Sequence, residues 1–314
     1  MVCIRPPPRP VFAYAAIVLA VTSFIPPRVE GMTSGTRDTL RIGVLLSADA
    51  ADTARAESIR RGVELGVEEA SRTAALFGLT VEVVTERGRA GADVLLAARR
   101  LAARPLAAMI AAPNDADCGA LRVLAADRRV LLLNLDCAGD VPRRGACNRF
   151  LLYIRPGHAT TTRARDRIAT AASESDDDPP VIALWHHTLS RFGAAQLNER
   201  FRRRFALEME STAWAGWMAM KILAEAALRG RSVGAIDLAR YLARPDARFD
   251  GHKGEPLSVD RASGELRQPL YVLQPAAPGR PAGRVVAELG ADALFGSRSG
   301  GQADACRAAG SDRG

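Results

Sequence analysis

The stretch TLRIGVLLSADAADTARAESIRRGVELGVEEASRTAALFGLTVEVVT (Thr39–Thr85) decides the fold class. It opens with a short, continuous apolar run, Leu40–Leu46, which is typical of a strand buried on both faces. A helix is expected from about Thr53 to Phe77, because apolar residues recur there at steps of three and four. Leu79–Thr85 then alternates between apolar and polar residues and is expected to form a second strand. The order strand, helix, strand predicts a βαβ unit with parallel strands.

The same alternation continues along the first half of the chain. Apolar runs predict strands and periodic stretches predict helices, in the order helix Ala92–Ala103, strand Leu106–Ala111, helix Asp115–Asp127, strand Val130–Leu135 and strand Phe150–Ile154. Strands separated by single helices are parallel, and their crossovers are right-handed. The sequence therefore predicts an α/β fold with a doubly wound parallel sheet over residues 39–155.

In such a sheet, ligands bind beyond the carboxyl ends of the strands. The polar residues that directly follow the first, third and fourth of these strands are therefore the candidate ligand-binding residues: Ser47, Asp49, Asn114, Asp115, Asn134 and Asp136. An alternative for Asn114 and Asp115 is that they only cap the helix that follows them.

The second half begins with a polar helix, expected at Thr160–Ala172, and an acidic, proline-containing linker, Ser173–Pro180. A strand, three helices and a hairpin are expected next, at Val181–Trp185, Phe192–Met209, Ser211–Leu228, Ser232–Leu242 and Leu257–Asp260 with Leu266–Leu273. The helix that starts at Ser211 is apolar on nearly all sides, so it is expected to be deeply buried. Residues 275–314 are rich in Gly, Ala, Arg and Ser and are expected to form a flexible tail.

The net charge of +8 does not indicate a nucleic-acid partner. Almost all of the positive charge is arginine, since the chain has only two lysines, Lys221 and Lys253. The arginines are interspersed with Asp and Glu, which is typical of solvated helix faces. Apolar residues make up 48% and charged residues 25% of the chain, as in ordinary globular proteins.

The N-terminus has the features of a secretory signal peptide at residues 1–23. Arg5 and Arg9 supply positive charge, Val11–Ala20 is an apolar run, and Val21–Ser23 offers small residues for cleavage. The apolar run is short for a membrane span, which needs about 20 residues. Export to the periplasm is expected, and an uncleaved anchor is the alternative.

The cysteines are consistent with export to an oxidising compartment. Cys3 lies within the signal, which leaves Cys118, Cys137, Cys147 and Cys306. Cys137 and Cys147 flank a Gly/Pro/Arg-rich loop, so a disulfide that closes this loop is expected. A zinc site is not favoured, because the sequence has no CxxC spacing. Neither a metal nor a cofactor is expected.

The block Val181–Gln274 contains three features in a fixed order. These are a Trp-containing helix (MESTAWAGWMAMKILAEAALR), an acid-Gly-x-Lys-Gly turn (DGHKG) and a Gly-turned hairpin ending in LRQP. In this order they resemble the C-terminal part of type I periplasmic solute-binding proteins of ABC importers. Within that family the block looks like the branch tied to PQQ-dependent alcohol catabolism. The resemblance implies a protein that binds a small molecule and passes it to a membrane permease, rather than an enzyme.

In the type I family two α/β lobes close over the ligand. Here only about 26 residues separate the first expected crossing after Ile154 from the return at Val181, whereas a lobe needs on the order of 100. One main lobe with a strongly reduced second lobe is therefore expected. The expected division is 1–23 signal, 39–155 first half of the lobe, 156–180 reduced second lobe and linker, 181–274 return segment and 275–314 tail.

Relatives that bind amino acids hold the ligand carboxylate at the turn after the third strand. Asp115 and Asp117 stand at the matching turn here and would repel a carboxylate, which favours a cationic, neutral polar or alcohol-related ligand. Two other classes of function stay open. One is a non-transporting periplasmic sensor or interaction protein, with a homodimer through the exposed lobe face. The other is an enzyme or metal site at His186 and His187, although adjacent side chains are expected to point apart.

Overall fold

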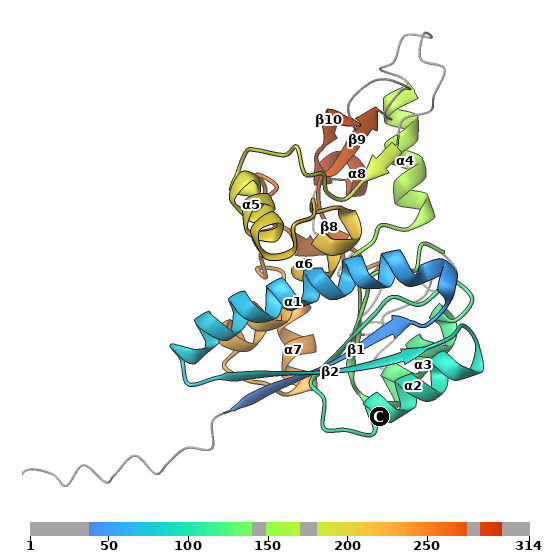
Figure 1. The fold of residues 1–314 in the computed structure, drawn as a ribbon, viewed down its shortest axis with the longest axis vertical. Coiled ribbons are helices and arrows are strands. Elements are labelled where there is room, and N and C mark those ends of the chain that lie inside the picture. The colour runs from blue at the N-terminus through green and yellow to red at the C-terminus, as the bar shows by residue number, and fades with distance from the viewer. Residues whose placement is uncertain (1–37, 140–148, 170–180, 275–282, 297–314) are drawn as a thin grey trace, which may run out of the picture. The chain divides into compact units, whose positions relative to one another are not determined.

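The computed structural model describes residues 38–139, 149–169, 181–274 and 283–296, so the expected signal peptide and acidic linker lie outside the described residues. A five-stranded sheet has the order β2-β1-β3-β4-β5, and all its neighbouring strands are parallel (Figure 1). Its strands are β1 Thr39–Ser47, β2 Thr80–Gly88, β3 Ala108–Ala111, β4 Leu131–Asn134 and β5 Leu151–Tyr153. The predicted doubly wound parallel sheet is confirmed.

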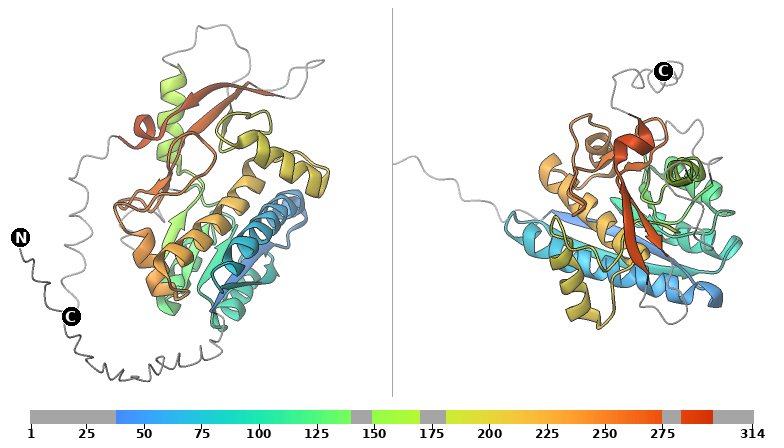
Figure 2. Two further views of the ribbon diagram at one scale, coloured as in Figure 1. Left: turned by 90° about the vertical axis from the view of Figure 1, so that its left-hand side faces the viewer. Right: turned by 90° about the horizontal axis from the view of Figure 1, so that it is seen from above.

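Helices cover both faces of this sheet (Figures 1 and 2): α1 Thr53–Ala75, α6 Ser211–Gly230 and α7 Ala235–Leu242 pack on one face, and α2 Ala92–Ala102 and α3 Cys118–Arg128 pack on the other. The other helices of the first half and of the C-terminal block are η1 Ala50–Asp52, α4 His158–Ala169 and α5 Ala194–Phe205. Alternate residues of β1 belong to different cores: Ile42 packs in the cluster with α1 and α6, and Leu45 packs in the cluster with α2 and α3. The continuous apolar pattern of β1 is explained by this burial on both faces.

Helices α1 and α6 lie side by side on one face of the sheet and approach closely (Figure 2). Glycines make the approach possible. A Cβ atom at Gly62 of α1 would lie 1.8 Å from the carbonyl oxygen of Ala213, and one at Gly216 of α6 would lie 2.6 Å from the carbonyl oxygen of Ile59. The two backbones are therefore in contact without intervening side chains.

A second, three-stranded sheet has the order β10-β9-β6 and is antiparallel throughout. It consists of β6 Val181–Ala183, β9 Leu270–Gln274 and β10 Arg284–Leu289, and α4 and α8 (Ala291–Phe295) lie beside it (Figure 1). The expectation that the whole of 275–314 is a flexible tail is wrong for residues 283–296. Arg284–Leu289 becomes a strand because it pairs with β9, a long-range contact that its own composition does not reveal.

The expected hairpin forms as β7 Ser258–Val259 and β8 Leu266–Arg267, which is shorter than expected. The run Leu266–Leu273, expected to be one strand, is divided between β8 and β9 at Gln268-Pro269. Proline lacks the N–H that continues a strand ladder, which explains the interruption.

Three sequence features of the C-terminal block meet around Lys253. Its Nζ donates hydrogen bonds to Gln268 Oε1 at 2.7 Å and to the carbonyl oxygen of Pro269 at 3.0 Å, and lies 4.0 Å from the centre of the Trp214 ring. Gln268 in turn donates to the carbonyl oxygen of Ile154 at 2.7 Å. Burial lowers the pKa of Lys253 well below its ordinary value. The Trp helix, the Lys turn and the LRQP segment therefore form one buried polar cluster that holds the end of β5.

Among the described residues, no helix combines the length and apolar character that a membrane span requires.

Acidification is expected to destabilise the fold through two half-buried histidines. Burial, partly opposed by Asp250, lowers the pKa of His252 from 6.5, and burial together with His187 lowers that of His186. Between the folded-state pKa and 6.5 the unfolded chain binds more protons, so stability falls as the pH drops through this window. Urea unfolding from pH 7.5 to 5 measures the loss, and His252→Asn, which suits the φ of 57° at this position, is expected to reduce it. The exposed control His158→Asn should keep the wild-type slope; stability that is constant from pH 7.5 to 5 contradicts the prediction.

Candidate functional site

A cavity of about 600 Å³ lies at the carboxyl ends of β4 and β5. The loops after these two strands form one side of it, and α4, β6, β9 and the first turn of α6 form the other. Chain segments that are far apart in sequence therefore share one hollow between the two sheets. Ligand sites in open α/β sheets lie at this end of the strands, and the volume suits a small organic molecule.

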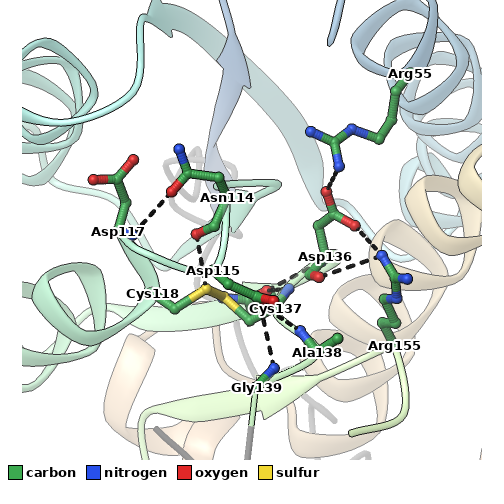
Figure 3. Close-up of a disulfide and its surroundings, with 11 residues drawn as sticks. Arg55, Asn114, Asp115, Asp117, Cys118, Asp136, Cys137, Ala138, Gly139 and Arg155 are labelled. Carbon is green, nitrogen blue, oxygen red and sulfur yellow. Dashed lines mark hydrogen bonds and ion pairs between the residues drawn. A yellow bond between two sulfur atoms is a disulfide. The ribbon is translucent and has the colours of Figure 1, made fainter. Parts of the chain in front are cut away.

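The loop after β4 places Asp136 in the cavity wall. Asn134 Oδ1 accepts hydrogen bonds from the backbone N–H of Asp136 at 3.1 Å and of Cys137 at 2.9 Å, which folds the loop back on its own strand. The buried Asp136 carboxylate then receives Arg55 Nη1 from α1 and Arg155 Nη1 from the segment after β5 (Figure 3). Asp136 thus joins α1 to the segment that leaves β5.

Positively charged groups face the cavity from two elements. Arg155 follows β5 and Arg165 belongs to α4. Arg165 makes no hydrogen bond or ion pair with any residue that the structure describes. The first turn of α6 also lines the cavity, and the amino end of a helix carries partial positive charge. Within the part of the lining that the structure describes, Asp136 is the one acidic residue, so these groups together favour an anionic ligand.

The rest of the lining is largely apolar. It comes from β6, the residue that follows it, β9 and α6, and consists mainly of Val181, Ile182, Leu184, Ala215 and Leu270. Ser211 Oγ at the start of α6 accepts the backbone N–H of Leu184 at 3.1 Å and of Trp185 at 3.2 Å. This hydroxyl fixes the end of β6 against α6, so the apolar wall is held in place by the framework itself.

Of the six residues expected to bind ligand, Asp136 lines the cavity and the other five do not. Ser47 and Asp49 fold the turn after β1, where Asp49 Oδ2 accepts the N–H of Ala90 at 3.0 Å. Asn114 Oδ1 accepts the N–H of Asp117 at 3.0 Å, which agrees with the capping alternative. These contacts are structural, and a ligand-binding role for the six stays a prediction.

Asp115 joins two loops rather than presenting a free carboxylate. Its Oδ1 accepts the backbone N–H of Ala138 at 2.8 Å and of Gly139 at 3.2 Å (Figure 3). Asp117, in the same turn, accepts the N–H of Gly91 at 3.1 Å. Because both acids are engaged away from the cavity, the expected repulsion of a ligand carboxylate at this turn does not apply to the cavity.

The expected disulfide between Cys137 and Cys147 is wrong, because Cys137 is bonded to Cys118 (Figure 3). Cys147 lies outside the described residues. Cys118 begins α3 and Cys137 follows β4, and the adjacency of β3 and β4 brings their following loops together, with the two Cα atoms 6.1 Å apart. Asp115 and these two sulfurs are close enough to resemble a metal site, but the bond between the sulfurs removes the thiolates that a metal requires.

His186 and His187 follow β6, and their rings lie 4.2 Å apart, tilted by 35°. The expectation that adjacent side chains point apart does not hold here, since this segment is a loop rather than a helix or strand. His186 Nδ1 lies 2.8 Å from Thr188 Oγ1. Neither ring lines the cavity at the ends of β4 and β5.

The cavity residues that sequence reasoning missed are Arg155 and Arg165, together with the first turn of α6. Arg155 directly follows a strand of the parallel sheet, so the rule that selected Asp136 applies to it equally. Arg165 and Ser211 carried no such signal, because their positions depend on how the second sheet and α6 pack against the first.

No protein-family model matches the sequence, and no curated protein sequence matches it. Solved structures with a similar fold include a periplasmic binding protein from Burkholderia mallei, with a TM-score of 0.70 and 11% identity over 82% of this chain and 96% of that one. An ABC transporter substrate-binding protein from Desulfitobacterium hafniense in complex with Leu has a TM-score of 0.67 and 14% identity, over 79% of this chain and 100% of that one.

A solute-binding protein of an ABC transporter from R. palustris, in complex with benzoate, has a TM-score of 0.65 and 12% identity, over 83% of this chain and 100% of that one. At these identities the likeness establishes the fold. The chain has the type I fold of periplasmic binding proteins, and these structural neighbours are binding proteins rather than enzymes.

Proposed function

We propose that this chain is the exported solute-binding component of an ABC importer and binds one small molecule non-covalently in the cavity at the ends of β4 and β5. The observation that carries the proposal is the cavity itself. It lies where ligands bind in this class of sheet, and it combines a few charged groups with an apolar wall.

Two further observations support the proposal. The fold is shared with solute-binding proteins of ABC transporters, two of which were solved in complex with Leu and with benzoate. The N-terminal sequence has the three parts of a secretory signal, which fits a role in the periplasm with a membrane permease as partner.

The motifs of the block Val181–Gln274 suggest the pathway to which the bound molecule belongs. We infer from the Trp helix, the Lys turn and the LRQP segment that the cargo belongs to PQQ-dependent alcohol catabolism. In this account β6, β9 and β10, with α4 and α8, correspond to a strongly reduced second lobe.

A thermal-shift screen of the protein lacking residues 1–23 tests the function. The compounds are organic acids, amino acids, alcohols, aldehydes, PQQ, and calcium or lanthanide ions. A ligand at 100 times its Kd adds about 2.7 kcal/mol to the free energy of unfolding, so the melting temperature is expected to rise selectively with one class.

A flat screen on a protein that melts cooperatively contradicts the proposal. That result, together with a stable ligand-free homodimer, supports the alternative of a periplasmic sensor or interaction protein. Size-exclusion chromatography with light scattering on the same sample measures the oligomeric state.

A further inference from the structure

The cavity offers a ligand more positive than negative charge. Among the described lining residues, the charged groups are the guanidinium groups of Arg155 and Arg165 and the carboxylate of Asp136, so their net charge is +1. Arg55, next to the cavity, is balanced by Asp52, whose Oδ1 lies 2.6 Å from Arg55 Nη2. An anionic group of a ligand can therefore pair with Arg165, which has no ion-pair partner among the residues that the structure describes.

Asp136 cannot serve a positively charged group of the ligand. Its Oδ2 accepts from Arg55 and its Oδ1 accepts from Arg155, and the side chain is 6% exposed. An ammonium group near this carboxylate would also lie near the two guanidinium groups, and like charges a few ångströms apart repel strongly at a partly buried site.

The hydroxyl groups of the wall are also engaged. Ser211 Oγ accepts two backbone N–H groups and donates to the carbonyl oxygen of Trp185 at 3.1 Å. Thr161 Oγ1 donates to the carbonyl oxygen of Gly157 at 2.9 Å, and Thr212 Oγ1 shares a hydrogen bond with Ser58 Oγ at 2.7 Å. Within the described lining, an α-ammonium group therefore meets repulsion, and the one carboxylate, Asp136, is already paired with two arginines.

The apolar wall is suited to a hydrocarbon body. Val181, Ile182 and Leu270 come from β6 and β9, whereas the two arginines come from other elements, Arg155 from the segment after β5 and Arg165 from α4. A molecule with one carboxylate and one apolar end matches this division, because each end then contacts groups of its own kind.

We propose that the cavity selects organic carboxylates that lack an α-ammonium group, with the carboxylate at Arg165 and Arg155 and the hydrocarbon body against β6 and β9. The inference rests on the proposed function and narrows it. It separates this chain from binding proteins for amino acids, since the ammonium of an amino acid is excluded by the same arginines that attract its carboxylate.

Isothermal titration with compounds that share one hydrocarbon body tests the selection. One set is 4-methylpentanoate, 4-methylpentanamide and leucine, and a second is phenylacetate, phenylacetamide and phenylglycine. In at least one set the simple acid is expected to bind at least about tenfold more tightly than its amide, because a hydrogen bond to a charged group is about twice as strong as a neutral one. It is also expected to bind at least about tenfold more tightly than the amino acid, because the ammonium group is repelled by the arginines.

The outcomes distinguish the inference from the function on which it rests. Equal or tighter binding of the amide or the amino acid overturns the inference and leaves solute binding intact, as does binding only of alcohols or cations. If the folded protein binds none of these compounds and none of the wider screen, the proposed function fails as well.

The variant Arg165→Gln tests the proposed contact directly. Arg165 is an exposed residue of the cavity lining and has no hydrogen-bond or ion-pair partner among the described residues, so its replacement is expected to leave the melting temperature unchanged. Carboxylate affinity is expected to fall about three- to tenfold, while binding of the amide stays within twofold.

Arg163→Gln is the matched control, because Arg163 is an exposed arginine of the same helix that does not line the cavity. It removes the same charge and is expected to change carboxylate affinity less than twofold. Equal weakening by the two variants would show that only long-range charge acts, which contradicts the assigned contact.

Discussion

Replacing Gly62 with alanine is expected to lower the free energy of unfolding by about 3 kcal/mol or more. The new Cβ would lie 1.8 Å from the carbonyl oxygen of Ala213, far inside contact distance. The clashing atom is backbone, so no side chain can rotate away, and α1 must separate from α6. Overpacking of a core costs about 1–3 kcal/mol even where side chains can adjust, which places this change at the upper end or beyond. Urea unfolding measures the loss.

Gly119→Ala is the matched control for this substitution. Gly119 lies in α3, and a Cβ there meets nothing within 4 Å. Alanine is expected to leave stability unchanged or to raise it by about 0.5–1 kcal/mol, because glycine loses more backbone freedom on folding. If Gly62→Ala changes the free energy of unfolding as little as Gly119→Ala does, then the backbones of α1 and α6 are not in direct contact at Gly62.

The second large effect is expected from loss of the disulfide. Cys118→Ser opens a covalent loop with a sequence separation of 19 between the bonded cysteines. The chain-entropy relation gives a cost of about 3 kcal/mol for a loop of this length. The same change frees the loop that carries Asp136, so ligand affinity is expected to fall along with stability.

Reducing agent supplies an internal control for the disulfide. It is expected to destabilise the wild-type protein to the level of Cys118→Ser and to have no further effect on that variant. A peptide map without reduction is expected to join the peptide of Cys118 to that of Cys137. A peptide that joins Cys137 to Cys147 instead contradicts the pairing.

The main sheet was predictable because its strands are buried on both faces. Leu40–Leu46 and Val130–Leu135 are continuous apolar runs, and the helical spacing of α1 is regular, so local pattern and burial agree. The second sheet was not predictable from the sequence, because Arg284–Leu289 becomes a strand only by pairing with β9. In this strand apolar and polar residues alternate only weakly, and the surrounding segment is rich in small and charged residues.

The cysteine pairing failed for a related reason. The loop between Cys137 and Cys147 suggested a local bond, whereas the observed bond depends on which strands are neighbours in the sheet. Strand order is a long-range property, and sequence spacing alone does not determine connectivity.

The site was predictable only in part. Asp136 was found because the carboxyl ends of parallel strands form ligand sites, and the same rule reaches Arg155 once β5 is included. Arg165 enters the cavity from α4, whose position depends on packing against β6 and α8. No spacing or motif in the sequence places α4 there.

The measurement that tests the central claim most directly is calorimetric titration of the best ligand into two matched variants, Val181→Trp and Val286→Trp. Both valines lie on strands of the second sheet and are about equally exposed, at 50% and 48%, but only Val181 lines the cavity. Binding in the cavity predicts at least about tenfold weaker affinity for Val181→Trp, because the indole fills the space, and wild-type affinity for Val286→Trp. Wild-type affinity in Val181→Trp would show that the ligand binds elsewhere.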